Sequence, residues 1–332
     1  MTYTSGSLIQ ASDYNTFTTT SGGLNDVWST GSGDKGWGQT TFTSAATSGT
    51  VTATQWAQLV NNLATSGSQT NTTLTSRTAP VTGNTISILA NVATDITSVT
   101  TNRGSAAAIG TEYGTFTGTT SQTATTGAGN TAWTITFTHT VTFPSAAQAR
   151  YFWNAGGIVR LKYGKSSTGL DSDPDWNTFI GYCGAINITG RVNSAAQTIA
   201  GTSYTGTTRV GGTGGTQTTL ATTTGWYSLT AGAAATTVFQ LTDSNAPYTG
   251  DTIVTTAAVN AGSTVLTLTT TFNSTARTGA GQNTQISGGT ATTSPSTTIT
   301  GTAPTVLCTY LPPSTTYLTN TWGTPTIAAS VA

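Results

Sequence analysis

Between Phe143 and Gly164 the pattern of hydrophobic and polar positions changes period twice, and it defines the clearest elements of the chain. Ser145 and Gln148 form a Ser-x-x-Gln capping box, in which each side chain binds the backbone N–H of the other residue. Gly156 and Gly157 supply a left-handed C-cap. We therefore predict a helix of about two turns between these two signals.

This helix places Ala149, Phe152 and Trp153 on one side, because positions three and four apart share a helical face. Period-two alternation flanks the helix, from Thr131 to Phe143 and from Ile158 to Tyr163, and indicates two strands. Two strands joined by an apolar helix fit a sandwich whose end is plugged by Phe152 and Trp153.

From residue 111 onward the chain consists of short alternating runs separated by Gly, Ser, Asn and Pro turns. Such runs are typical of an antiparallel sandwich. The Thr- and Gly-rich segments between them are predicted to be long loops or edge hairpins. The other predicted strands are Phe179 to Thr189, Gly225 to Leu229, Thr237 to Leu241, Asp251 to Val259, Ser263 to Phe272 and one strand after Thr305.

The first 110 residues have a helical period instead. Thr52 and Gln55 form a second capping box, and the apolar residues after it lie on one helical stripe. An earlier helix is predicted from Ser12 to Trp28. We therefore predict an α+β, mainly β fold, with a helical assembly or attachment region at residues 1–110 and antiparallel β-sandwich-like modules at residues 111–332.

A short heptad seam is predicted at the end of the helical region. Its members are Ile86, Leu89, Ala93 and Ile96, which repeat at alternating spacings of three and four. The seam is compatible with an intramolecular bundle or with a symmetry axis between copies. Because a seam of this length associates weakly alone, its partner must be held by other contacts as well.

Charged residues are scarce: they make up 6% of the 332 residues, and the formal net charge is zero, whereas soluble domains usually contain ~25%. The sequence contains no cluster of Lys and Arg residues of the kind that binds nucleic acid. No run approaches the ~18 apolar residues of a membrane span, so we expect no membrane insertion. A neutral surface gives little colloidal protection, so we expect the protein to cover much of it with copies of itself.

Few residues offer chemistry. His139 is the single histidine and lies mid-strand without a recognisable triad. Cys183 and Cys308 are compatible with a disulfide or with two small buried hydrophobes. We expect the second, because we expect the chain to carry no secretion signal and to be assembled in a reducing compartment. The glycine-rich run GSGDKGWGQ lacks the Lys-Ser/Thr pair of a phosphate-binding loop, and we predict a turn that packs Trp37.

The densest acidic cluster is Asp171, Asp173 and Asp175, whose spacing matches the start of a calcium loop. Trp176 and Tyr182 stand where that loop needs glycine and glutamate, so an ordinary polar turn is favoured over a metal site. Acids this close on one turn do not face each other across a cleft as glycosidase carboxylates do. We therefore expect no enzyme and no cofactor.

The run ARYFWNAGGIVRLKYG, followed by DSDPDW, resembles a segment of tail, tail-fibre and other virion structural proteins of tailed bacteriophages. The resemblance extends upstream to GSLIQASDYN, GSGDKGWGQ and VTATQWAQLVNNL, and downstream to VFQLTDSNAPYTGDTIVTTAAVNAGSTVLTLTTTF, in the same order. It implies a building block of a virion, and it carries over no catalytic residue.

On this resemblance we expect a non-enzymatic structural component of a tailed-phage virion, tail- or fibre-associated, made in the host cytoplasm and released by lysis. Its expected partners are other virion proteins and copies of itself in a homo-oligomer, with a trimer favoured. The alternative is a receptor- or glycan-binding module on a phage fibre, because exposed aromatic rings stack on sugars. A hydrolase ranks third.

Overall fold

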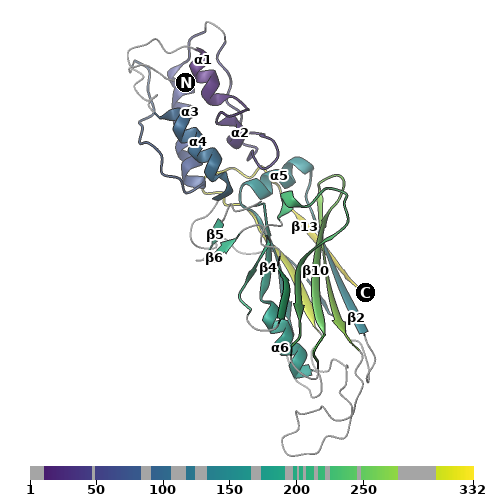
Figure 1. The fold of residues 1–332 in the computed structure, drawn as a ribbon. Coiled ribbons are helices and arrows are strands. Elements are labelled where there is room, and N and C mark those ends of the chain that lie inside the picture. Colours follow the sequence, from purple (N-terminus) through teal and green to yellow (C-terminus); the bar gives the residue numbers. More distant parts are fainter. Residues whose placement is uncertain are drawn as a thin grey trace, which may run out of the picture.

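The computed structural model describes residues 11–46, 49–83, 91–105, 117–123, 133–165, 173–190, 197–199, 202–204, 207–212, 216–220, 225–244, 248–275 and 304–332. The fold is α+β, as the sequence predicts. The four helices before residue 105 gather at one end of the molecule, and two antiparallel sheets with two further helices form the rest (Figure 1). The predicted domain boundary between residues 110 and 111 lies outside the described residues.

Four helices build the helical region: α1 (Ala11–Thr18), α2 (Asn25–Trp28), α3 (Ala53–Gln69) and α4 (Val92–Asn102), which continues into the 3-10 turn η1 (Arg103–Ser105). The single early helix that we predicted is two helices, because Gly22 takes a left-handed φ of 78° and the chain turns back. The capping box of Thr52 and Gln55 is confirmed, with both reciprocal hydrogen bonds present.

The predicted heptad seam is out of phase with the helix that forms. In α4 the buried apolar positions are Val92, Ile96 and Val99, whereas Ala93 is exposed. Ile96 is only 2% exposed and belongs to the core of the bundle, so it is not available to another copy. Ile86 and Leu89 lie outside the described residues. The error arose because the heptad pattern was extended from them into α4.

Two antiparallel sheets form the sandwich, and their edge strands include segments that the sequence predicted to be loops or edge hairpins. One sheet has the order β1-β12-β3-β4-β7 and the other the order β13-β2-β11-β10-β9-β8, while β5 and β6 pair separately. The strands are β1 (Thr117–Thr123), β2 (Trp133–Thr142), β3 (Ile158–Gly164), β4 (Ala185–Thr189), β5 (Gln197–Ile199), β6 (Thr202–Tyr204), β7 (Thr207–Val210), β8 (Thr216–Leu220), β9 (Thr236–Thr242), β10 (Thr252–Val259), β11 (Val265–Ser274), β12 (Thr305–Leu311) and β13 (Thr326–Val331).

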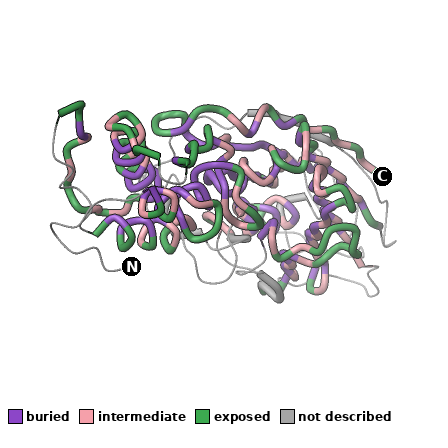
Figure 2. Tube along the Cα trace, turned by 90° about the horizontal axis from the view of Figure 1, so that it is seen from above, coloured by how far each residue is buried: buried purple, intermediate pink, exposed green. Residues whose placement is uncertain are grey.

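The sheets pack face to face through aromatic and threonine side chains. Tyr163 of β3 stacks 6.2 Å from Phe239 of β9, and its hydroxyl lies 2.7 Å from the Thr255 hydroxyl on β10. Along β10 and β11 buried and half-buried positions alternate. This is the period-two pattern that the sequence shows, and Figure 2 shows the buried positions gathered inside the molecule.

The predicted plug helix is α5 (Ala146–Asn154), between β2 and β3. The Ser145 side chain accepts from the Gln148 N–H, but the Gln148 side chain accepts from the Ser145 hydroxyl, so only half of the predicted box forms. Gly156 has the expected left-handed φ, 101°. Gly157 is required for space instead, since a Cβ there would lie 2.4 Å from the Phe152 ring.

Phe152 and Trp153 fill the end of the sandwich, as predicted. Their rings are perpendicular and 4.9 Å apart. Trp153 also stacks on Trp226 at 5.3 Å and packs against Phe143 at the end of β2. All four side chains are nearly or fully buried. The plug therefore joins β2, α5 and the turn around Trp226 in one aromatic cluster.

Two predicted strands are wrong. Residues Asp173–Cys183 form helix α6, and only β4 remains of the strand predicted from Phe179 to Thr189. The helical spacing is present in Trp176, Phe179 and Ile180. It was overlooked because the apolar residues of β4 follow directly and extend the run beyond the helix. Gly225 to Leu229 contains the 3-10 turn η2 (Trp226–Ser228) instead of a strand. α6 lies at the end of the sandwich opposite α5 (Figure 1).

We predict that Trp153→Ala lowers the free energy of unfolding by about 3–5 kcal/mol, the usual cost of removing a large buried aromatic side chain. Trp153 is 2% exposed and contacts three aromatic rings. Thermal and denaturant unfolding measure the effect. Tyr317→Ala, at a 37% exposed ring, is the control and should change little. Coincident unfolding curves for Trp153→Ala and wild type would contradict the plug.

Candidate functional site

The most elaborate arrangement of polar side chains lies where the helical region meets the sandwich. We call it the joint. It consists of loop 31–38, of Gln39 with residues 319–321, of Arg150 and Asn154 on α5, and of Tyr227. These segments are far apart in the sequence, so the joint exists only in the folded chain.

Asn154, the last residue of α5, is the centre of the joint. Its side-chain NH₂ donates to the carbonyl oxygens of Gly33, Lys35 and Gly36 at 3.3, 2.8 and 3.1 Å. Its side-chain oxygen accepts from the Tyr227 hydroxyl at 2.7 Å. The residue is 8% exposed, and a buried amide is stable only when such bonds satisfy it. Asn154 therefore fixes the shape and the position of the loop.

Trp37 also fixes the position of this loop. Its ring is fully buried, and its Nε1–H donates to the Asn154 backbone carbonyl at 3.1 Å. Gly36 and Gly38 have left-handed φ values of 93° and 71°. A Cβ on Gly36 would lie 2.1 Å from the Thr30 carbonyl oxygen. The glycines therefore serve a close backbone turn that buries Trp37, as predicted, although it packs on α5 as well as on the helices.

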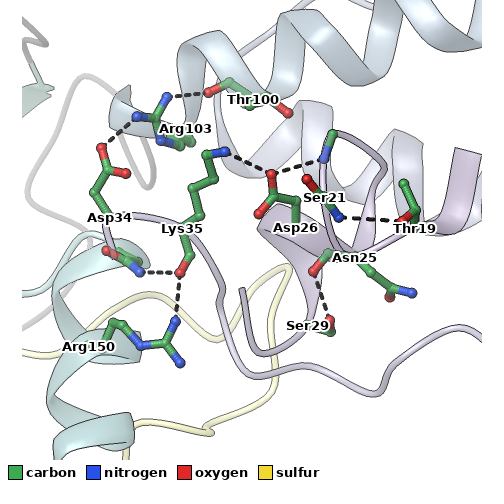
Figure 3. Close-up of polar contacts among 12 residues, drawn as sticks. Thr19, Ser21, Asn25, Asp26, Ser29, Asp34, Lys35, Thr100, Arg103 and Arg150 are labelled. Carbon is green, nitrogen blue, oxygen red and sulfur yellow. Dashed lines mark hydrogen bonds and ion pairs between the residues drawn. The ribbon is translucent and has the colours of Figure 1, made fainter. Parts of the chain in front are cut away.

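Charged side chains surround the loop (Figure 3). Arg103 pairs with Asp34 at 2.5 Å, and Lys35 pairs with Asp26 at 2.7 Å. Arg150 donates to the Lys35 carbonyl at 3.1 Å. The Arg103, Asp34 and Lys35 side chains are about one third exposed, and such exposed pairs usually contribute ~0–1 kcal/mol. They orient the loop, while the buried Asn154 and Trp37 supply most of its stability.

The C-terminal segment crosses the same place. Gln39 and Thr319 exchange two hydrogen bonds of 3.0 Å, from the Gln39 amide to the Thr319 carbonyl and from the Thr319 N–H to the Gln39 side-chain oxygen. The Thr321 hydroxyl donates to the Trp37 carbonyl at 2.5 Å. The joint thus ties residues near both ends of the chain to α5.

A groove of about 370 Å³ lies beside the joint. It shares Arg150 and Tyr227 with the joint, and burial raises the pKa of the Tyr227 phenol above its ordinary value. This phenol therefore stays a neutral hydrogen-bond donor. The lining residues come from α5, from the segment around η2 and from the β10–β11 turn: Ala146, Ala147, Arg150, Trp226, Tyr227, Leu229, Ala231, Val259 and Ser263.

The residues that offered chemistry in the sequence lie apart from the joint. His139 is fully buried on β2, opposite Leu268 and Ala329 in the neighbouring strands. Cys183 and Cys308 are buried and free, which agrees with two small buried hydrophobes. Burial raises the pKa of the Cys308 thiol to about 12 and also raises that of Cys183. Neither thiol is a nucleophile at neutral pH.

The acidic cluster does not form the polar turn that we predicted. Asp173 and Asp175 lie in the helical backbone of α6, not in a calcium-type loop, and Asp171 lies outside the described residues. Within the described ranges, no three His, Cys, Asp or Glu side chains lie together as a metal site would require. Over the same ranges, no helix is both long and apolar enough to cross a membrane.

Comparisons with protein-family models, with curated proteins and with solved structures found no match. What can be said of function therefore rests on the geometry of this chain and on the sequence resemblance.

The sequence pointed to part of this site. The glycine spacing and Trp37 indicated a tight turn, and Trp153 indicated a plug. The roles of Arg150, Asn154 and Tyr227 were missed, because their partners are 73 to 121 positions away. A polar asparagine at the end of an apolar helix, directly after Trp153, was the one local signal.

We predict that Asn154→Ala destabilises the protein by about 1–3 kcal/mol, because buried carbonyls and the Tyr227 hydroxyl lose their partner. It should also speed tryptic cleavage after Lys35, which lies in the released loop. Asn102→Ala, which removes an exposed side-chain hydrogen bond to Thr72, is the control. Equal cleavage rates and equal stability for both variants would show that Asn154 does not hold the joint.

The buried thiols predict a pH dependence. Both folded pKa values are raised, so the folded state holds these protons more tightly than the unfolded state. Their contribution to stability is complete below pH 9 and is lost as the pH rises toward about 12. Unfolding in denaturant at pH 8 to 11 should show the decline. Cys183→Ala/Cys308→Ala should reduce its slope most below pH 10, because the buried Tyr163 and Tyr227 phenols, whose pKa values are also raised, contribute only above that pH. An unchanged slope in the double variant would assign the decline to other groups.

Proposed function

We propose that this protein is a non-enzymatic structural component of a tailed-phage virion, associated with the tail or a fibre and assembled as a homo-oligomer. The joint is the observation that carries this proposal. A structural part of a virion needs a fixed orientation between the region that attaches it and the region that points outward. In this chain, buried hydrogen bonds of Asn154 and Trp37 connect the helical region to the sandwich. The resemblance to tailed-phage structural proteins supplies the biological setting.

In this proposal the helical region serves attachment, and the sandwich projects from it. The helical region and α6 lie at opposite ends of the molecule (Figure 1), which suits a part with one attached and one outward end. The low charge of the chain favours surfaces that are covered in an assembly. A trimer remains the favoured state, with contacts other than Ile96, which the bundle itself buries.

A second candidate function is a receptor- or glycan-binding module on a phage fibre. The groove beside the joint favours it, because Trp226, Tyr227 and Arg150 line one concave surface. Aromatic and cationic side chains on a concave surface are the usual elements of a small-ligand site. The two functions are compatible, since a fibre protein can be both structural and adhesive.

We predict that particles of a phage encoding this sequence contain the chain, and that antibody labelling in negative stain marks the tail or its fibres. The purified chain should sediment as one oligomer of about 100 kDa, three times its mass of 33.6 kDa, if it is the favoured trimer.

Labelling with preimmune serum is the control, and it should leave the tail and its fibres unmarked. Particles that lack the chain would overturn the virion role. A single 33.6 kDa species at micromolar concentrations would overturn the homo-oligomer but not the virion role. Release of reducing ends from host polysaccharide would contradict the non-enzymatic assignment.

A further inference from the structure

The groove beside the joint carries a positive charge that no described residue neutralises. Arg150 is the single charged residue among those that line it. The ion pairs found among the described residues involve Lys35, Arg77 and Arg103, not Arg150. The nearby carboxylate of Asp34 is already paired with Arg103.

The known contacts of Arg150 leave much of its guanidinium free. One nitrogen donates to the Lys35 carbonyl, and the group lies 5.2 Å from the centre of the Tyr151 ring. A guanidinium carries five N–H donors in a planar fork that matches an oxyanion. The remaining donors are therefore available to an anion in the groove.

The walls of the groove add an apolar surface and one free hydroxyl. Leu229, which is half-buried, and Ala231, which is exposed, contribute apolar side chains to the lining beside the buried Trp226. Ser263 stands at the β10–β11 turn with a left-handed φ of 53°. Among the described residues its hydroxyl has no hydrogen-bond partner. A ligand that fits must present an anionic group, an apolar face and hydroxyls.

We propose that this groove binds a carboxylate-bearing sugar unit of an acidic saccharide. The carboxylate pairs with Arg150, the apolar face of the sugar ring lies against Leu229 and Ala231, and a ring hydroxyl bonds to Ser263. The single charge of Arg150 balances that of a carboxylate, whereas a phosphate monoester carries about −1.5 to −2 at pH 7 and would keep an unbalanced charge. The proposal rests on the glycan-binding function given above and names its ligand class.

The same two side chains connect this site to the joint. Arg150 holds the Lys35 carbonyl, and Tyr227 holds Asn154. A ligand that binds Arg150 in its observed position binds the conformation in which Arg150 also donates to the Lys35 carbonyl. Binding therefore increases the population of that conformation. Saturating ligand should therefore slow tryptic cleavage after Lys35.

Calorimetric titration with tetragalacturonic acid, and with its fully methyl-esterified form, tests the proposal on the full chain. The acid should bind and the ester should bind at least ten-fold more weakly, because only the acid can pair with Arg150. Arg150→Gln should weaken binding of the acid about ten- to hundred-fold, the usual loss when a charged hydrogen-bonding group is removed.

A second variant protects the test against misfolding at the joint. Ala147 is an exposed residue on the lip of the groove, so Ala147→Tyr should fill the groove and block binding while Arg150 stays in place. Ala147→Ser controls for the substitution itself. Lys162→Gln removes an exposed charge on β3 that does not line the groove, and it should leave binding unchanged.

Each result decides the proposal. Loss of binding in Arg150→Gln and Ala147→Tyr, with retention in both controls, supports it. Equal binding of acid and ester, or unchanged binding in either groove variant, overturns this site and this ligand class but leaves a glycan-binding function. No binding of either tetrasaccharide, repeated with 3′-sialyllactose and lactose, overturns the site and the glycan-binding function together, and leaves the structural role.

Discussion

The side chain of Asn154 is the constraint on which the rest of this structure depends. A buried carboxamide must satisfy both its NH₂ and its oxygen, since each unsatisfied group costs about 1–3 kcal/mol. In this chain the partners are the carbonyls of loop 31–38 and the hydroxyl of Tyr227. Satisfying one residue therefore fixes three segments: the end of the plug helix, the loop of the helical region and the turn around η2.

The aromatic core makes that constraint effective. Trp153 precedes Asn154 on α5 and is packed between Phe143, Phe152 and Trp226. Because this plug holds α5 at the end of the sandwich, the packing of α5 on the sandwich itself directs Asn154 toward loop 31–38. A loop that could close in many ways, given its glycines, is held in one way by Asn154 and Trp37.

The joint and the groove use the same side chains for different purposes. Arg150 and Tyr227 bind the joint with one part of their surface and line the groove with another. An adhesive function placed here would be mechanically connected to the helical region. The side chains of His139 on β2, Cys183 at the end of α6 and Cys308 on β12 are instead buried in the interior of the protein.

The sequence by itself determined the elements whose signals are local. The capping box at Thr52, the plug helix after Ser145, its glycine stop, the alternating strands β2, β3, β9, β10 and β11, and the α+β class all follow from spacings within about a dozen residues. Helix α6 was missed because its apolar face runs directly into a buried strand, and periodicity does not separate the two. The phase of α4 was missed because burial depends on its neighbours in the bundle.

Only the tertiary structure decided the joint and the groove, since hydrogen bonds such as that from Gln39 to Thr319 span 280 positions. No local pattern specifies a partner at that distance, and only the packing of both regions on α5 brings such residues together.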